Sequence, residues 1–521
     1  MSTVRDELLV LADSDRPALR WREGAALREL TWTEYVAAAQ ALAHRLEARL
    51  DPGRPPHVGV LLDNGPDLAI HLPAAGLGGH VLVGLNTTRR GDALAADVRK
   101  ADCQVLVTDS AHAGLLDDLD LGDVEVVFGD ALDRPERIPL IHTPVAGLTE
   151  DSLFMLIFTS GTSGDPKAVR VTHRKVTEPA AYVAERLGLT PDDVHYVSMP
   201  LFHSNGVLAG WAPALHRGAT IAPAVFSARG FLDDVRALGA TYANYVGKPL
   251  SYVLATHERP DDADNPLRLV FGNEAGDRDT AEFGRRFGCR VIDGFGSTEN
   301  AVVISRIEGT PAGSLGRPLD GVAVLDPATG QECPRARYDA DGRVANLDDC
   351  VGELVNTTGA GQFAGYYNDP EATAERMRGG MYWSGDLAYR DADGWVFYAG
   401  RTSDWLRVDG ENLAAAPIER ILLRHPAIAE AAVYGVPDPL SGDQLVAALV
   451  LRGPLTPEDF GLFLAGQADL GTKSWPRHVH VLTALPRTAT NKVLKRALQA
   501  CGIGGSTWLR EERGTRYTAA G

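Results

Sequence analysis

The chain has few cysteines, and they lie far apart. Its 521 residues include five, Cys103, Cys289, Cys333, Cys350 and Cys501, and none forms a Cys-x-x-Cys pair. This spacing gives no zinc signature and argues against a disulfide framework. We therefore expect buried or unreactive thiols.

Long hydrophobic segments are also missing. No apolar stretch reaches the length of about 18 residues that a membrane-spanning helix requires. The first residues, Met-Ser-Thr-Val-Arg-Asp-Glu-Leu, carry acids and lack the apolar core of a signal peptide. These absences predict a cytoplasmic protein without a membrane span.

The chain also lacks an excess of positive charge. Lysine and arginine number 51 against 69 aspartates and glutamates, which gives a net charge of −18. Nucleic acids and anionic lipid need a basic face, so neither is expected as a partner. A nucleotide can still bind in a locally basic pocket. With 45% hydrophobic and 23% charged residues, the composition is that of an ordinary globular protein.

The order of apolar patterns predicts an α/β fold. A helical pattern covers 33–48, and continuous apolar runs at 57–62, 104–108, 124–128 and 268–271 are typical of buried strands. Helices that alternate with such strands indicate layers with largely parallel sheets. No internal repeat or low-complexity segment interrupts them.

The chain is too long for one hydrophobic core. Glycine-punctuated short strands at 315–400 indicate a β-rich subdomain, and a boundary is expected at 402–404. We therefore predict a large domain over 1–401, a hinge at 402–404 and a compact α+β domain over 405–521. The last dozen residues are expected to be disordered.

Residues 158–173 carry the strongest functional signal: Phe-Thr-Ser-Gly-Thr-Ser-Gly-Asp-Pro-Lys-Ala-Val-Arg-Val-Thr-His. An apolar strand ends in a loop of glycines and hydroxyl residues, whose N–H groups and hydroxyls can hold phosphate oxygens, and Lys167 adds a cation. A Walker loop fits poorly, because its lysine opens a helix, whereas the residues after Lys167 alternate like a strand. The remaining alternative is a mobile surface loop.

Four further segments carry candidate ligands. In 293–299, Asp-Gly-Phe-Gly-Ser-Thr-Glu, Phe295 could stack on a base and Glu299 could hold Mg²⁺, although a tight turn with an exposed acid is the alternative. Asp386 suits the paired hydroxyls of a ribose, and Arg401 places a cation near the predicted boundary. Lys492 precedes a basic helix over 493–498. Taken alone, Asp386, Arg401 or Lys492 could equally be a charged side chain exposed to solvent.

Taken in order, these segments resemble the signature motifs of the adenylate-forming superfamily, which includes acyl-CoA synthetases, adenylation domains and luciferases. The resemblance covers about residues 30–500. The run Arg-Thr-Ser-Asp-Trp-Leu-Arg-Val-Asp-Gly-Glu-Asn at 401–412 looks closest to the branch of fatty-acid-transport-protein-like ligases, which activate long-chain and bulky polycyclic acids. The family implies a large AMP-binding domain and a small mobile domain that carries a catalytic lysine.

The resemblance also implies a role for each motif residue. Lys492, Glu299, His203, Thr159 and Lys167 would be catalytic, with Glu299 the metal ligand and Ser403 the hinge. ATP or AMP would be bound by Thr159, Ser160, Gly161, Thr162, Ser163, Gly164, Lys167, Gly272, Asn273, Glu274, Asp293, Gly294, Phe295, Gly296, Ser297, Thr298, Asp386, Tyr398 and Arg401. The acyl pocket would be formed by His203, Val246, Gly247, Lys248 and Gly296, and the CoA channel by Gly410, Glu411 and Asn412.

The implied reaction uses ATP, Mg²⁺ and CoA, and makes an acyl-adenylate before the CoA thioester. Three alternatives stay open. The acceptor could be a carrier protein, or the chain could bind acyl-adenylate or fatty acid without catalysis. It could also receive acyl-adenylate from a partner enzyme and perform only thioester formation, since Asn300 stands where many relatives have glycine. The sequence does not identify the acid, and it is compatible with a homodimer.

Overall fold

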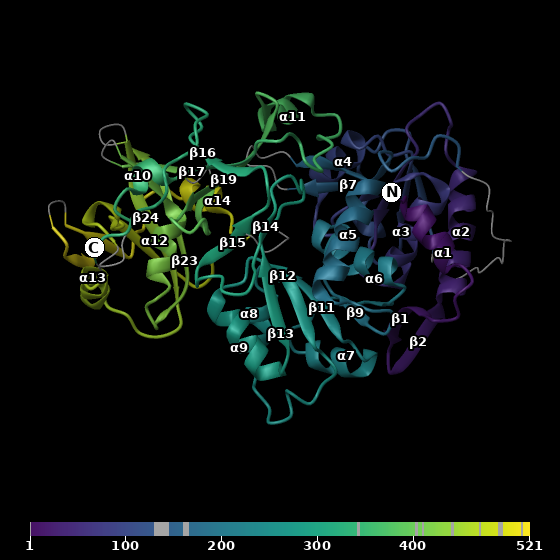
Figure 1. Ribbon diagram of the computed structural model, residues 1–521, viewed down its shortest axis with the longest axis horizontal. Helices are drawn as coiled ribbons and strands as arrows, with labels where there is room; N and C mark the ends of the chain where they lie inside the picture. The colour runs from purple at the N-terminus through teal and green to yellow at the C-terminus, as the bar shows by residue number, and fades with distance from the viewer. Residues whose placement is uncertain are drawn as a thin grey trace. The chain divides into compact units, whose positions relative to one another are not determined.

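The computed structural model describes residues 2–129, 145–159, 166–340, 344–401, 405–408, 411–438, 442–467, 470–487, 493–511 and 514–520 (Figure 1). Contacts divide the chain into two compact units. The first comprises Met1–Asn300 and Gln362–Ala374, and the second comprises Ala301–Gly361 and Glu375–Gly521. The predicted hinge at 402–404 lies outside the described residues, and the predicted domain boundary stays a prediction.

One sheet of the first unit contains the strand that precedes the predicted phosphate loop. Its order is β6-β5-β3-β4-β7-β8, parallel except that β7 and β8 are antiparallel. Its strands are β3 (His57–Leu61), β4 (Val81–Gly84), β5 (Val105–Thr108), β6 (Glu125–Phe128), β7 (Leu153–Thr159) and β8 (Lys167–Thr172). The continuous apolar runs are therefore strands of a parallel sheet, as predicted.

A second sheet of this unit has the order β13-β12-β11-β9-β10-β1-β2, parallel except for the β1–β2 hairpin. Its strands are β1 (Pro17–Glu23), β2 (Ala26–Thr31), β9 (Val194–Val197), β10 (Thr220–Pro223), β11 (Tyr242–Val246), β12 (Leu269–Asn273) and β13 (Arg290–Gly294). The carboxyl ends of β11, β12 and β13 lie side by side, because the three are parallel neighbours.

Helices cover these sheets in layers, which the buried clusters define. The main core packs α1 (Val4–Leu11), α2 (Trp32–Glu47), α3 (Pro66–Gly78), α5 (His173–Leu187) and α6 (Ala212–Arg217) against apolar residues of both sheets. The outer faces are covered by α4 (Gly91–Lys100) on one sheet and by α7 (Phe231–Leu238), α8 (Pro249–Leu254) and α9 (Asp277–Phe287) on the other (Figure 1).

Local chemistry sets the helix ends. Thr31 and Glu34 form a capping box at the start of α2, which matches the helix predicted at 33–48. At the end of α5, Gly188 takes the left-handed conformation that closes a helix. The helix predicted at 33–48 differs from α2 by one residue at each end.

The second unit contains two further sheets. One has the order β14-β15-β20-β19-β17-β16, with β18 beside β19, and the other β22-β21-β24-β25-β26-β27, with β23 beside β24. The first set is β14 (Ile304–Ser305), β15 (Ser314–Pro318), β16 (Val322–Leu325), β17 (Gly352–Asn356), β18 (Met377–Arg378), β19 (Met381–Arg390) and β20 (Val396–Arg401). The second set is β21 (Trp405–Val408), β22 (Glu411–Ala414), β23 (Ile428–Asp438), β24 (Gly442–Leu451), β25 (His478–Leu482), β26 (Trp508–Arg510) and β27 (Tyr517–Ala519).

The remaining helices are short. They are α10 (Leu347–Cys350), α11 (Pro370–Arg376), α12 (Ala415–Leu422), α13 (Pro457–Ala465) and α14 (Lys495–Ala500). The α/β class with a β-rich region is as predicted. Within the described residues, no helix combines the length and the apolar character needed to cross a membrane.

The expectation of a disordered C-terminus is wrong for the described residues 514–520. There β27 pairs antiparallel with β26. Tyr517 is buried, its ring packs edge-on against Phe460, and its hydroxyl donates to the carbonyl of Pro476. A polar sequence hid this strand, because its anchor is one aromatic residue whose partners lie elsewhere in the chain.

Candidate active site

The two ends of the predicted phosphate loop face each other across an antiparallel strand pair. Thr159 ends β7, Lys167 begins β8, and the two are register partners. The Thr159 hydroxyl donates to the Lys167 carbonyl at 3.4 Å. A strand follows the loop, so the strand–loop–strand arrangement is confirmed and a Walker loop is excluded. Ser160, Gly161, Thr162, Ser163 and Gly164 lie outside the described residues.

Tyr366 joins Lys167 to Glu299. The Lys167 ammonium lies 5.3 Å from the centroid of the Tyr366 ring, and the Tyr366 hydroxyl donates to Glu299 Oε1 at 2.8 Å. Lys167 is only 7% exposed, so this cation is largely removed from bulk water. The lysine of the predicted phosphate loop and the predicted metal ligand therefore belong to one cluster.

Two other predicted segments meet at the carboxyl ends of parallel strands. Asp293, near the end of β13, accepts from the Tyr245 hydroxyl at 2.6 Å and from the Ala275 N–H at 2.9 Å. Gly272 packs so closely on β11 that a Cβ would lie 2.1 Å from the Tyr245 carbonyl oxygen. The Asn273 amide nitrogen lies within 3.7 Å of the position that a Cβ on Gly296 would take.

These contacts bring residues 245–248, 271–275 and 293–296 together. The Gly247 N–H donates to the Asn273 carbonyl at 2.9 Å, and Val246 pairs with Asn273 across β11 and β12. Glu274 takes a positive φ of 69°, and Lys248 is the residue that precedes α8. Ligands of open α/β sheets bind at such carboxyl ends, which is consistent with the predicted roles.

The His203 segment lies next to the 297–299 turn. The Ser204 and Thr298 hydroxyls are 2.9 Å apart, and Thr298 is buried. A π-helix, η2 (Asn205–Trp211), begins two residues after His203. Extended π-helix is rare and is frequently found at functional sites. Ser297, which begins this turn, is exposed, and Phe295 lies between the end of β13 and the turn.

The backbone of Asn300 has a conformation that suits glycine, the residue that the family resemblance implies at this position. Its φ is +51°, in the left-handed region that glycine adopts without strain and asparagine tolerates better than most residues. The side-chain amide donates to Gln362 Oε1 at 2.8 Å, and Gln362 in turn donates to Glu178 at 3.0 Å. The Asn300 side chain is thus engaged with Gln362, on the segment that also carries Tyr366.

In the second unit, Asp386 and Arg401 are cross-strand partners on β19 and β20. Arg401 Nε lies 3.4 Å from Asp386 Oδ1, and the Asp386 side chain is 10% exposed. Tyr398 lies on the same strand as Arg401. The structure therefore brings together two residues that the sequence linked only by order. Glu411 and Asn412 lie in β22, whereas Ser403, Gly410 and Lys492 lie outside the described residues.

Sequence reasoning missed Tyr366 and Lys175. Lys175 is 1% exposed, and its ammonium donates to the Glu299 carbonyl oxygen at 2.9 Å. Burial lowers its pKa to about 8, while the Glu299 charge acts in the opposite direction. Neither residue carries a distinctive sequence signal. A Tyr-Tyr pair at 366–367 and a lysine two positions after His173 read as ordinary residues.

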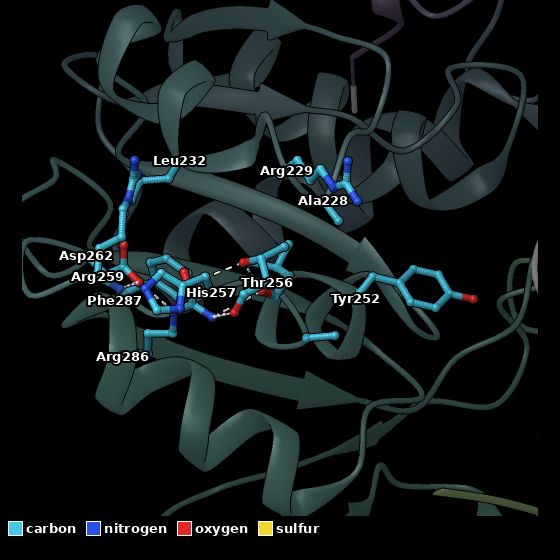
Figure 2. A pocket seen from close by; sticks show the side chains of 12 residues that line it. Ala228, Arg229, Leu232, Tyr252, Thr256, His257, Arg259, Asp262, Arg286 and Phe287 are labelled. Carbon is cyan, nitrogen blue, oxygen red and sulfur yellow. Dashed lines mark hydrogen bonds and ion pairs between the residues drawn. The ribbon is translucent and has the colours of Figure 1, made fainter. Parts of the chain in front are cut away.

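A pocket of about 570 Å³ lies elsewhere on the first unit, beside α7, α8 and α9 (Figure 2). No residue predicted for the site lines it. Arg286 in its wall pairs with Asp262 at 2.6 Å and donates to the carbonyls of Thr256 and His257. Its charge therefore holds the loop before β12 in place.

Comparison with known protein families shows to which family the chain belongs. The family model described as AMP-binding enzyme matches residues 10–367, and the model described as AMP-binding enzyme C-terminal domain matches residues 417–492. The chain belongs to the AMP-binding enzyme family. The predicted membership of the adenylate-forming superfamily is confirmed.

Two curated relatives of this AMP-binding enzyme cover nearly its whole length. It is 54% identical to the medium/long-chain-fatty-acid–CoA ligase FadD17 of Mycobacterium marinum, over 92% of this chain and 93% of the relative. It is 44% identical to the steroid-22-oyl-CoA synthetase of Rhodococcus jostii, over 96% and 91%. The predicted class, an acid–thiol ligase of the acyl-CoA synthetase type, is thereby confirmed.

Solved structures confirm the fold. ATP-bound MatB from Rhodopseudomonas palustris has a TM-score of 0.81 at 24% identity, and covers 96% of this chain and 99% of its own. The o-succinylbenzoate CoA synthetase MenE from Bacillus subtilis, in complex with ATP and magnesium ion, has a TM-score of 0.77 at 26% identity, with coverage of 96% and 99%.

Proposed function

We propose that this AMP-binding enzyme converts a medium- or long-chain fatty acid, or a bulky polycyclic acid, into its CoA thioester through an acyl-adenylate. The observation that carries the proposal is the cluster of Lys167, Tyr366 and Glu299 beside the phosphate-loop ends. The substrate class is supported by the two relatives named for fatty-acid and steroid-22-oyl substrates.

The two ends of the loop, Thr159 and Lys167, would bind the phosphates of ATP. The buried Lys167 ammonium would attract the oxygens of the triphosphate, and electrostatic interaction is strengthened where water is excluded. Asp386, paired with Arg401, would accept from the ribose hydroxyls. Lys492 would neutralise charge that develops between the attacking carboxylate and the α-phosphate.

The chemistry of the site fits Mg²⁺ that arrives with ATP. Among the described residues, no group of three or more His, Cys, Asp or Glu side chains could form a metal site of its own. Mg²⁺ commonly binds through one or two carboxylates together with substrate phosphates, and Glu299 offers such a carboxylate. When bound, the ion supplies positive charge to the phosphate oxygens.

The second half-reaction would require the C-terminal segment to move. Rotation at Ser403 would withdraw Lys492 and bring Gly410, Glu411 and Asn412 to the site, where the CoA thiol attacks the acyl-adenylate and releases AMP. Hinged motions of this kind commonly complete catalytic sites. The acid would lie along 245–248 and Gly296, with His203 at its entrance.

The contacts of Asn300 favour an intact first half-reaction. The hypothesis of a chain that only forms thioesters rested on the presence of a side chain at this position. That side chain donates to Gln362, and the backbone has the left-handed conformation that a glycine would also adopt. The substitution therefore gives no structural reason for lost adenylation.

Pyrophosphate release tests the proposal directly. The protein is incubated with ATP, Mg²⁺ and dodecanoate, palmitate, benzoate or cholate, with and without CoA, and the thioester is measured by mass spectrometry. We expect release with the fatty acids or cholate and thioester only when CoA is present. Pyrophosphate release without thioester would indicate a carrier-protein acceptor. If thioester forms only when acyl-adenylate is supplied, and no pyrophosphate is released from ATP and acid, the proposed adenylation step would be wrong.

A Lys492→Ala variant separates the two half-reactions. We expect the pyrophosphate-releasing step to slow by about 10²–10³-fold, because a charge that stabilises the transition state is lost. Thioester formation from supplied acyl-adenylate is expected to continue, since Lys492 leaves the site for that step. Undiminished pyrophosphate release would remove Lys492 from the active site.

A further inference from the structure

The Glu299 turn is held from two sides by residues remote in sequence. Its carbonyl oxygen accepts from the Lys175 ammonium at 2.9 Å, and its carboxylate accepts from the Tyr366 hydroxyl at 2.8 Å. The turn itself closes with the Asn300 N–H donating to the Ser297 carbonyl at 3.1 Å. Both the backbone and the side chain of Glu299 are therefore fixed.

Lys175 lies at the N-terminal end of a helix, where a positive charge does not stabilise the helix. It is in the first turn of α5, and its N–H donates to the capping Thr172 hydroxyl at 3.2 Å. The helix dipole disfavours a positive charge at this end, and burial of the ammonium adds a desolvation cost. Among the described residues, the Glu299 carbonyl oxygen is the hydrogen-bond acceptor of the Lys175 ammonium. The contact with Glu299 offsets part of these costs.

Tyr366 belongs to a segment that is itself anchored. Its backbone forms a bridge with Val169 on β8, and its N–H donates to the Thr373 hydroxyl at 2.9 Å. The same segment carries Gln362, which accepts from Asn300. It thus contacts both Glu299 and the residue after it, and it places the tyrosine ring beside Lys167.

We propose that Lys175 and Tyr366 are positioning residues that orient Glu299 toward Mg²⁺·ATP. This inference rests on the proposed function, which gives Glu299 its role as metal ligand. Neither residue needs to touch the substrate. Together they restrict the turn and the side-chain rotamer of Glu299, so that little conformational freedom is lost when the metal binds.

Three variants test the proposal. Lys175→Met keeps the length and the apolar stem of the side chain but removes the charge and the donor. Tyr366→Phe keeps the ring beside Lys167 and removes only the hydroxyl. The matched control is Tyr367→Phe, because the hydroxyl of this neighbouring tyrosine donates to Asp102 at 2.9 Å and does not contact Glu299.

The readout is ATP binding by calorimetry, in Mg²⁺ and in EDTA, beside the Mg²⁺ dependence of pyrophosphate release. We expect Lys175→Met and Tyr366→Phe to weaken the Mg²⁺-dependent part of ATP binding about 10-fold, as loss of supporting contacts to a metal ligand commonly does. ATP binding in EDTA and the KM for the acid are expected to stay unchanged. Tyr367→Phe should behave like the unaltered chain.

Unaltered Mg²⁺ dependence in both variants, even with reduced thermal stability, would assign the two residues a purely structural role and overturn the proposal. Should Lys175→Met fail to fold, the result for Tyr366→Phe decides. Failure of the proposed function looks different. In that case the unaltered chain itself would show no Mg²⁺-dependent ATP binding.

Discussion

At the scale of single residues, the site depends on backbone conformations as well as on charged groups. Asn300 and Glu274 both take a positive φ, of 51° and 69°, beside residues predicted to bind ATP. For a residue other than glycine, the left-handed backbone conformation costs about 1–2 kcal/mol of conformational free energy. Asparagine reduces that cost through local hydrogen bonds of its side chain. Such strained positions are concentrated at functional sites.

Substitutions of Asn300 test this account. Asn300→Gly relieves the left-handed strain and loses the bond to Gln362, so we expect little change in stability. Asn300→Ala loses the bond and keeps the strain, which should cost about 1 kcal/mol or more. Urea unfolding measures both. A large gain in pyrophosphate release for Asn300→Gly would show instead that the native asparagine impairs adenylation.

At the scale of secondary-structure elements, close packing of parallel strands positions residues that are predicted to bind ATP. Gly272 in β12 lies against the backbone of β11, where a Cβ would approach the Tyr245 carbonyl oxygen to 2.1 Å. Tyr245 in turn donates to Asp293 on β13. Three neighbouring strands are therefore coupled through one glycine, which has a packing role whatever it contributes to nucleotide binding.

Gly272→Ala should consequently be severely destabilising. The atom in the way belongs to the backbone of a central strand, so the sheet would have to move, and overpacking of this kind costs typically 1–3 kcal/mol. Gly276→Ala is the matched control, since a Cβ there meets nothing within 4 Å. Comparable unfolding midpoints for the two variants in urea would contradict the packing argument.

At the scale of the whole molecule, buried imidazoles make stability depend on pH. Burial lowers the pKa of His71 to about 3 and those of His80, His173 and His195 to about 4. His173 Nδ1 accepts from the Val4 N–H at 3.2 Å, which requires a neutral ring. All four histidines are therefore uncharged in the folded chain at neutral pH.

The sign of the pH effect follows from linkage. An unfolded histidine binds a proton below about pH 6.5, whereas the folded one does so only near its lowered pKa. Stability is complete above pH 6.5 and falls as the pH drops toward 4, by about 1–2 kcal/mol per histidine at pH 5. His71→Leu should flatten this dependence in urea unfolding between pH 7.5 and pH 5. An unchanged slope would contradict the assignment.

The sequence by itself determined the class of fold and the order of the motifs. Continuous apolar strands alternating with helices require covered parallel sheets, and the phosphate loop between two strands distinguishes its motif from a Walker loop. These signals are local, so a single sequence contains them. The roles of Lys492, Ser403 and Gly410 stay predictions, because those residues lie outside the described part of the chain.

Only the tertiary structure decided which residues support the site. Lys175, Glu299 and Tyr366 come from three distant segments, and nothing local in the sequence marks the first or the last. Their contacts depend on how α5, the 297–300 turn and the segment after Gln362 pack together. The strand at Tyr517 was missed for the same reason, since its partners Phe460 and Pro476 meet it only in the folded chain. Packing between remote segments selects such pairs, and a pattern within a short window does not contain that information.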